Sequence, residues 1–284
     1  MKTLKTMAVI AAAALTAVSC GQKEEAQKVL VLYYSQTSNT KIVAENIATR
    51  LGADIEEIVP VNPYDGDFQA TIERCMQERQ QGTVPEIQPV AADLSQYDVI
   101  FIGYPIWFGT FAPPVAAFLD TADLSGKKVV PFCTFGSGGL ESSIKDLQAK
   151  QPNAELLPGY GVRAARMAAA PKEVETFLVA GGFIEGEYTA PADFPEQHEA
   201  SAEEVAIFDA AVGDYPMINA QAQTVAVRTV PEGVEYMFTA VDKPRMEGPI
   251  AISDNKPKLP PATTMTIYVL VANGEAPVFT RVVR

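Results

Sequence analysis

The residues with the clearest chemical potential form one short polar segment near the start of the chain. It reads Ser35, Gln36, Thr37, Ser38, Asn39 and Thr40, between an apolar run and a stretch of helical periodicity. A helix N-cap needs only one Ser, Thr or Asn, whereas five of these six residues belong to those types. Their hydroxyls and the unpaired N–H groups of a first helical turn predict a phosphate site that needs no Lys or Arg. The segment carries neither G-x-G-x-x-G nor a Walker sequence, so it gives no support to a dinucleotide or nucleoside-triphosphate site.

A second candidate surrounds the only Trp of the chain. Residues 97–104 predict a buried strand, and five residues follow it directly: Pro105, Ile106, Trp107, Phe108 and Gly109. An indole ring in such a loop can stack on an aromatic ligand, or it can simply cover the hydrophobic core. Ligands of open α/β sheets bind at the carboxyl ends of the strands, which favours a role for Trp107 in a binding site.

A third candidate follows the next apolar run, residues 127–134. The run ends at Thr134, and after it come Phe135, Gly136, Ser137, Gly138 and Gly139. Residues with small side chains allow the backbone to approach a ligand closely. The same composition would suit a plain Gly-rich turn, and the sequence leaves both interpretations open.

Alternating strands and helices must position these three loops. Strands are predicted at residues 28–34, 53–59, 97–104, 127–134 and 155–162. Helical periodicity follows each strand, and the last predicted helix begins at Pro171 and ends at Gly181. This alternation predicts an α/β fold with a doubly wound, five-stranded parallel sheet.

The polar segment resembles the S/T-x-T-G-x-T loop that holds the FMN phosphate in the flavodoxin family. Ser35, Thr37, Asn39 and Thr40 match this loop, and Ser38 stands where the family usually has Gly. The resemblance implies a flavodoxin-like sheet with strand order 2-1-3-4-5, with all three loops at one sheet edge. It also implies that FMN is the cofactor.

The two later loops resemble the parts of a flavodoxin that surround the flavin ring. P-I-W-F-G, residues 105–109, is similar to the loop of a flavodoxin-like branch. The resemblance implies that Trp107 covers one face of the flavin and that Phe135 covers the other. Residues 136–139 would form the second loop beside the flavin.

The N-terminal residues 1–27 read as a lipoprotein signal peptide and tether. Lys2 and Lys5 precede an apolar run, residues 7–18, that is too short for an ordinary membrane span. The segment that ends at Cys20 resembles a bacterial lipoprotein box, which implies lipidation of Cys20. The protein would then be lipid-anchored in the bacterial cell envelope, in the periplasm or at the cell surface. A plain secretory peptide is the alternative.

The remaining sequence divides into three parts. Residues 28–184 form the expected FMN-binding domain, residues 185–200 a linker, and residues 201–284 a small α+β domain. The last part contains one helix, which begins with a capping box at Ser201, and about four antiparallel strands. It faintly resembles a cystatin-like domain.

Composition narrows the function classes. The net charge of −13 argues against a nucleic-acid binder. Three Cys and one His show no metal-ligand spacing, and His198 lies in a stretch rich in Pro and Glu, so a Ser–His hydrolase is not supported. We predict no catalytic side chain and leave open whether the protein is an enzyme.

Three hypotheses about function follow. The first is a membrane-anchored, FMN-binding flavodoxin-like protein that transfers electrons to or from a redox partner protein. The second is an FMN-dependent NAD(P)H:quinone-type oxidoreductase. The third is an envelope binding module without flavin.

Overall fold

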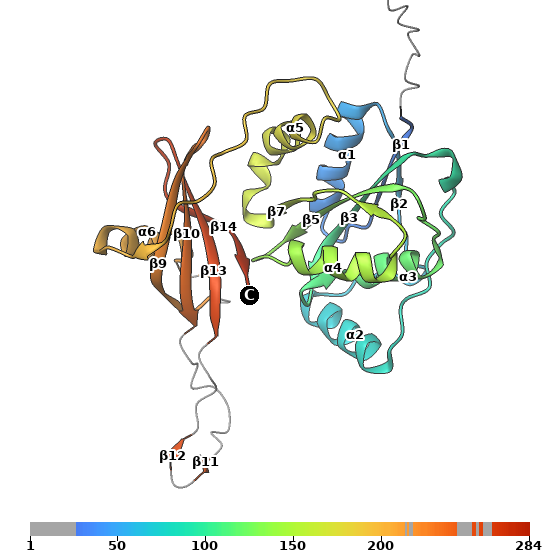
Figure 1. Ribbon diagram of the computed structural model, residues 1–284. Helices are drawn as coiled ribbons and strands as arrows, with labels where there is room; N and C mark the ends of the chain where they lie inside the picture. The colour runs from blue at the N-terminus through green and yellow to red at the C-terminus, as the bar shows by residue number, and fades with distance from the viewer. Residues whose placement is uncertain (1–26, 214, 216–217, 243–251, 254–255, 258–262) are drawn as a thin grey trace, which may run out of the picture.

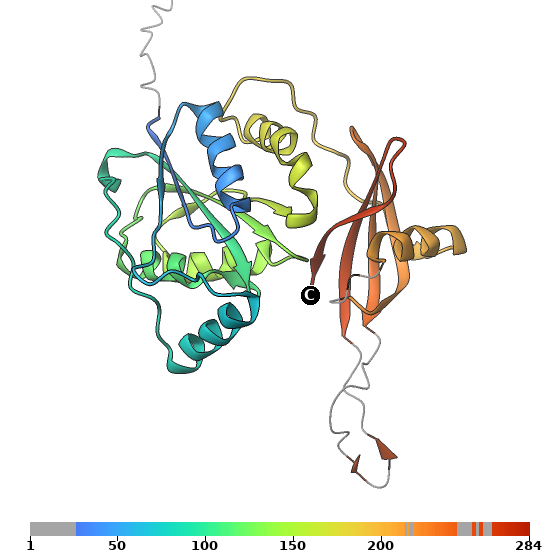
Figure 2. The same ribbon diagram turned by 180° about the vertical axis from the view of Figure 1, so that it is seen from behind.

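The structure is a computed structural model of the 284-residue chain. It describes residues 27–213, 215, 218–242, 252–253, 256–257 and 263–284. The predicted signal peptide and Cys20 therefore lie outside the described residues. An α/β domain is followed by a domain with an antiparallel sheet and one helix, and the C-terminal end of the chain lies between the two (Figures 1 and 2).

A parallel sheet forms the centre of the first domain. Its strands are β1 (Val29–Tyr33), β2 (Asp54–Glu57), β3 (Val99–Trp107), β5 (Lys128–Phe135), β6 (Glu155–Leu156) and β7 (Tyr160–Arg163). They run in the order β2-β1-β3-β5, and β6 and β7 both pair with β5. The predicted fifth strand is thus split in two. With β6 and β7 counted as one interrupted strand, the predicted order 2-1-3-4-5 is confirmed.

Helices cover both faces of this sheet (Figure 1). They are α1 (Asn39–Leu51), α2 (Phe68–Gln81), α3 (Pro113–Thr121), α4 (Leu140–Lys150) and α5 (Ala170–Ala180), with short 3-10 helices at Leu94–Gln96 and Ala164–Ala169. One core lies under α1 and α5 and contains the fully buried Ile47 and Leu178. The other lies under α3 and α4 and contains Phe118 and Leu147. Burial of each such side chain stabilises the fold by about 1.5–3 kcal/mol.

Strand β3 is longer than the sequence predicts. It continues through Trp107, and a two-residue turn at Phe108 and Gly109 leads into β4 (Thr110–Phe111). Trp107 pairs with Thr110 in this hairpin. Phe108 and Gly109 have φ of 51° and 83°, the positive values that two-residue hairpin turns of type I′ require. The prediction that residues 105–109 form a loop is therefore wrong for residues 105–107.

The second domain confirms the predicted antiparallel sheet and helix. Its sheet has the order β14-β13-β10-β9-β8. The strands are β8 (His198–Glu199), β9 (Ala220–Val230), β10 (Gly233–Asp242), β13 (Thr264–Ala272) and β14 (Val278–Val283), and the helix is α6 (Ala202–Val212). Ser201 and Glu204 form the predicted capping box. A separate short pair, β11 (Ile252–Ser253) and β12 (Lys256–Pro257), lies beyond β10 along the chain. The cystatin-like resemblance stays a prediction.

Among the helices that the structure describes, none combines the length and the apolar character needed to cross a membrane.

Candidate functional site: a cavity at the sheet edge

The predicted phosphate segment lies between the end of β1 and the start of α1. Ser38 is the N-cap residue of α1 and adopts the left-handed conformation, with φ of 66°. A glycine would favour the same conformation, so Ser38 preserves the backbone path that the S/T-x-T-G-x-T loop implies. No side chain among the described residues caps the N-terminus of α1. Its first N–H groups therefore remain available to an anion.

Ser35 adds an unpaired hydroxyl at this helix end. In the described part of the chain, its Oγ is buried and has no hydrogen-bond partner. An unpaired buried hydroxyl costs about 1–3 kcal/mol of stability, and natural proteins usually pair such groups. A phosphate oxygen would satisfy this hydroxyl. The segment thus fits the phosphate end of FMN.

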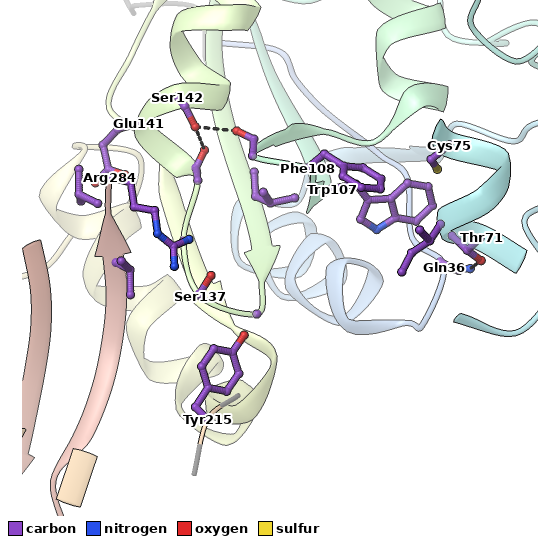
Figure 3. A pocket seen from close by; sticks show the side chains of 18 of the residues that line it. Gln36, Thr71, Cys75, Trp107, Phe108, Ser137, Glu141, Ser142, Tyr215 and Arg284 are labelled. Atoms are coloured by element: carbon purple, nitrogen blue, oxygen red, sulfur yellow. Dashed lines mark hydrogen bonds between the residues drawn. The ribbon is translucent and has the colours of Figure 1, made fainter. Parts of the chain in front are cut away.

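Two other residues of the segment connect it to its surroundings. The buried Thr40 hydroxyl lies 2.9 Å from the hydroxyl of Thr134, at the end of β5. The Gln36 amide donates to the Tyr64 carbonyl oxygen and to the Thr71 hydroxyl, each over 2.9 Å. Gln36 is directed toward α2 and lines the cavity described next (Figure 3).

A cavity of about 740 Å³ opens where the three predicted loops meet. This volume falls in the range of small-molecule and cofactor sites. Of the predicted site residues, those that line it come from all three loops: Gln36, Ile106, Trp107, Phe108, Gly109, Gly136, Ser137, Gly138 and Gly139. Helix α2 contributes Phe68, Thr71, Ile72 and Cys75, and α4 contributes Glu141, Ser142 and Lys145. The second domain contributes Tyr215, Val282, Val283 and Arg284.

Trp107 forms a wall that the core holds in place. The edge-to-face partners of its ring are Tyr34 and Tyr64, with centroids 5.8 and 5.2 Å away. Tyr64 is itself fixed, because its hydroxyl donates to Glu78 over 2.6 Å and the Arg74 guanidinium lies 3.7 Å from its ring centroid. Burial, followed by the Glu78 carboxylate, raises the pKa of Tyr64 well above its usual value, which keeps it a donor. Trp107 therefore covers the core and lines the cavity at once.

The turn after Trp107 exposes an aromatic side chain at the edge of the cavity. Phe108 is 51% exposed, and Phe68 at the start of α2 is 82% exposed. The Arg79 guanidinium lies 5.4 Å from the Phe108 ring centroid. This side of the cavity is apolar and open to solvent.

The third loop lines the cavity, but the residue before it does not. Phe135 is 5% exposed and packs within the core under α3 and α4. The structure gives it a packing role, so the prediction that Phe135 covers the second flavin face has no support from its position. Thr134 is also buried, and neither it nor Pro105 lines the cavity.

A hydroxyl of α4 links the second and third loops. The Ser142 Oγ lies 2.6 Å from the Gly109 carbonyl oxygen and 3.0 Å from that of Gly139 (Figure 3). The Ser142 hydroxyl therefore ties the two loops to each other beside the cavity. Charged side chains here are Glu141, Lys145 and Arg284.

The two described cysteines are buried and unbonded to each other. Cys75 lines the cavity, and burial raises the pKa of its thiol to about 11. Burial raises the pKa of Cys133 as well. Both are neutral thiols at pH 7, which makes them poor nucleophiles.

Sequence reasoning missed several residues that line the cavity or pack behind its Trp107 wall. Tyr64 lies in a turn whose sequence predicts no ring contact. Phe68 precedes residues 70–80, for which the sequence predicts a helix. Tyr215 and Arg284 belong to the second domain, and no local pattern assigns them to this site. Tyr34 lies at the end of the first predicted strand, next to the polar segment, so its position in the sequence could have indicated that it lies near the site.

Sequence and structure comparisons identify relatives of the first domain. The profile of the family described as Flavodoxin matches residues 28–176. The chain is 33% identical over 102 residues to an NAD(P)H dehydrogenase (quinone) from Cupriavidus metallidurans, covering 34% of this chain and 46% of that protein. The chain is 32% identical over 130 residues to an NAD(P)H dehydrogenase (quinone) from Azorhizobium caulinodans. This match covers 41% of this chain and 62% of that protein. The chain thus spans about half the length of the curated relatives it matches.

Solved structures give similar matches. A proposed flavoprotein from Bacteroides eggerthii is 29% identical, with 54% of this chain and 97% of that chain covered and a TM-score of 0.48. A flavoprotein from Lactobacillus acidophilus in complex with FMN is 27% identical. The match covers 48% of this chain and 93% of that chain, with a TM-score of 0.43. Since the family profile covers more than half of the sequence, this chain belongs to the flavodoxin family, whose cofactor is FMN.

Proposed function

We propose that this protein is an FMN-binding electron-transfer protein, anchored in the bacterial envelope through Cys20. The single observation that carries the flavin part is the set of unpaired donors at the start of α1, which adjoins the aromatic cavity. There, the buried Ser35 hydroxyl has no partner among the described residues, and no side chain caps the helix. Gln36 belongs both to the anion segment and to the cavity lining, so the segment adjoins the cavity.

Each part of the site has a separate task. Ser35 and the first N–H groups of α1 would hold the phosphate, and Trp107 would orient the ring. FMN, when bound, supplies the one- and two-electron chemistry, while the protein supplies position and electrostatics. The Tyr34 and Tyr64 contacts hold the Trp107 indole, so little conformational freedom is lost on binding.

FMN titration of the purified mature chain tests this proposal. Trp107 is the only Trp, so its fluorescence reports on the cavity directly. We expect quenching that saturates at one FMN per chain, together with a flavin absorption spectrum. A colourless protein whose Trp fluorescence does not respond to FMN would contradict the proposal and favour the flavin-free binding module.

A second candidate function is an FMN-dependent NAD(P)H:quinone-type oxidoreductase. The names of the relatives from Cupriavidus metallidurans and Azorhizobium caulinodans motivate it. The apolar, solvent-open side of the cavity at Phe68 and Phe108 suits a ring-shaped acceptor. Oxidation of NADH or NADPH that depends on both FMN and added benzoquinone would favour this candidate over simple electron transfer.

The anchoring needs its own test because Cys20 lies outside the described residues. We expect metabolic labelling with a radioactive fatty acid to mark the wild-type protein, and Cys20→Ala to abolish the label and release the protein from the membrane fraction. A labelled C20A variant would place the lipid elsewhere. An unlabelled wild type would favour a plain secretory peptide.

A further inference from the structure

The second domain contacts the loop that is expected to border the flavin. Strand β14 is the edge strand of its sheet, and its outer edge faces residues 136–139. The Val282 N–H donates to the Ser137 carbonyl oxygen over 2.7 Å, and Val282 also forms a parallel bridge with Gly138. The backbone of one domain therefore hydrogen-bonds to a loop of the other. Figure 1 shows β14 on the side of its sheet that faces the first domain.

Gly138 shows how closely the two backbones approach. Its φ lies outside the left-handed range, so the turn itself does not require glycine. A Cβ at this position would lie 2.1 Å from the Val282 carbonyl oxygen, well below any real contact distance. The presence of β14 therefore explains why residue 138 has no side chain.

Arg163, at the end of β7, stabilises the same contact between β14 and the loop at residues 136–139. It is 6% exposed. Its Nε donates to the Gly136 carbonyl oxygen and its guanidinium to the Phe279 carbonyl oxygen, each over 2.8 Å. The guanidinium also lies 3.3 Å from the Phe279 ring centroid. One buried cation thus bridges the third loop and β14.

Tyr215, which follows α6, brings an aromatic ring to the cavity. Its hydroxyl lies 2.9 Å from the position that a Cβ of Gly136 would occupy. Its ring packs on Phe279, with the centroids 5.2 Å apart. Figure 3 shows Tyr215 and Trp107 on different sides of the cavity. Tyr215 thus supplies the cavity with an aromatic side chain, whereas the predicted Phe135 does not line it.

We propose that the C-terminal domain is a structural part of the FMN site. Strand β14 fixes the loop at residues 136–139, and Tyr215 forms the cavity wall opposite Trp107. This inference rests on the proposed FMN binding and gives residues 201–284 a specific role. Binding and domain docking are then coupled, so that loosening the docking weakens FMN binding, and FMN strengthens the docking by the same factor.

Paired variants of the full chain test the coupling. Val282→Pro removes the N–H that reaches Ser137, at an edge-strand position where Pro can be accommodated, whereas Val282→Ala keeps that N–H. Both variants lose packing of the Val282 side chain, so their difference isolates the backbone contact. We expect V282P to bind FMN about five- to tenfold more weakly than V282A, as measured by Trp107 fluorescence, which corresponds to one hydrogen bond.

A second pair leaves the hydrogen bond between Val282 and Ser137 in place. Tyr215→Ala should weaken FMN binding by about tenfold, because it removes a wall of the cavity, whereas Tyr215→Phe should keep most of the affinity. Amide hydrogen exchange of Val282 gives a readout that does not depend on activity. We expect slower exchange of this amide when FMN is added to the wild-type chain.

The outcomes separate this inference from the proposed function. Equal FMN affinities within both variant pairs, or a Val282 amide whose exchange FMN leaves unchanged, would overturn the inference while FMN binding by the wild type stands. A wild-type chain that binds no FMN would overturn the proposed function and the inference together.

Discussion

The hydroxyls of Thr40 and Thr134 lie 2.9 Å apart, although the two residues are 94 positions apart in the sequence. The two residues are 1% and 4% exposed. The contact joins the first turn of α1 to the end of β5, directly before the third loop. The anion segment and the loop that meets the second domain are therefore connected through one buried hydrogen bond.

Thr134→Val should lower the free energy of unfolding by about 1–3 kcal/mol. The substitution preserves shape but leaves the buried Thr40 hydroxyl without its partner. Thr134→Ser keeps a hydroxyl at the same place and serves as the control. Urea unfolding of both variants checks the prediction, and equal stabilities would show that the hydrogen bond contributes nothing.

Ser35→Ala should have opposite effects on stability and on binding. Without FMN, loss of an unpaired buried hydroxyl should leave the free energy of unfolding unchanged or raise it by up to about 1 kcal/mol. With FMN, loss of a hydrogen bond to a charged phosphate should weaken binding by about tenfold or more. Urea unfolding of the apoprotein and Trp107 fluorescence titration measure the two effects.

Ser38→Gly is the matched control for this prediction. It relieves the left-handed conformation at φ of 66° without removing any hydrogen bond of the described structure, so FMN affinity should be retained. An S35A variant that binds FMN as tightly as S38G would rule out a phosphate contact by Ser35.

Phe108→Asn should raise the free energy of unfolding by about 0.5–1 kcal/mol. Phe108 has a positive φ, and a left-handed conformation costs a non-glycine residue about 1–2 kcal/mol, whereas Asn is well suited to a type I′ turn. Phe68→Ser is the control, because Phe68 is exposed but not strained, and it should change stability by less than about 0.5 kcal/mol. Thermal unfolding compares them. A destabilised F108N would show that the Phe108 ring makes contacts that outweigh the strain.

Lys145→Met should lower the reduction potential of the bound flavin. Lys145 lines the cavity and forms no ion pair or hydrogen bond with any described residue. Electrons that enter the cavity bring negative charge, which a nearby ammonium group stabilises. An interaction on the order of 1 kcal/mol corresponds to roughly 20 mV for a two-electron couple.

Redox titration of the FMN-loaded protein measures this shift. Lys150→Met offers a control on the same helix, because Lys150 pairs with Asp120 and does not line the cavity. Equal potentials of the K145M and K150M variants would place Lys145 too far from the ring to act on it.

Much of the fold could be predicted from the sequence because its signals are local. The apolar run before Ser35 and the Gly52 that ends α1 are encoded in neighbouring residues, and so is the capping box at Ser201. Even the C-terminal strands follow from alternation along each segment. The Trp loop was more difficult, since a positive φ at Phe108 lets β3 continue and turn where the Pro and Gly residues predict a loop.

The candidate site likewise has features that are encoded locally and features that depend on the tertiary structure. The sequence by itself determined the three loops at the strand ends, the abundance of hydroxyls in the first and the single indole in the second. Only the tertiary structure decided which aromatic rings accompany them. It placed Phe135 in the core, set Tyr34 and Tyr64 against Trp107, and brought Tyr215 from another domain. Such contacts join residues that are far apart in the chain. They arise from the packing of whole helices and strands, so local sequence patterns do not predict them.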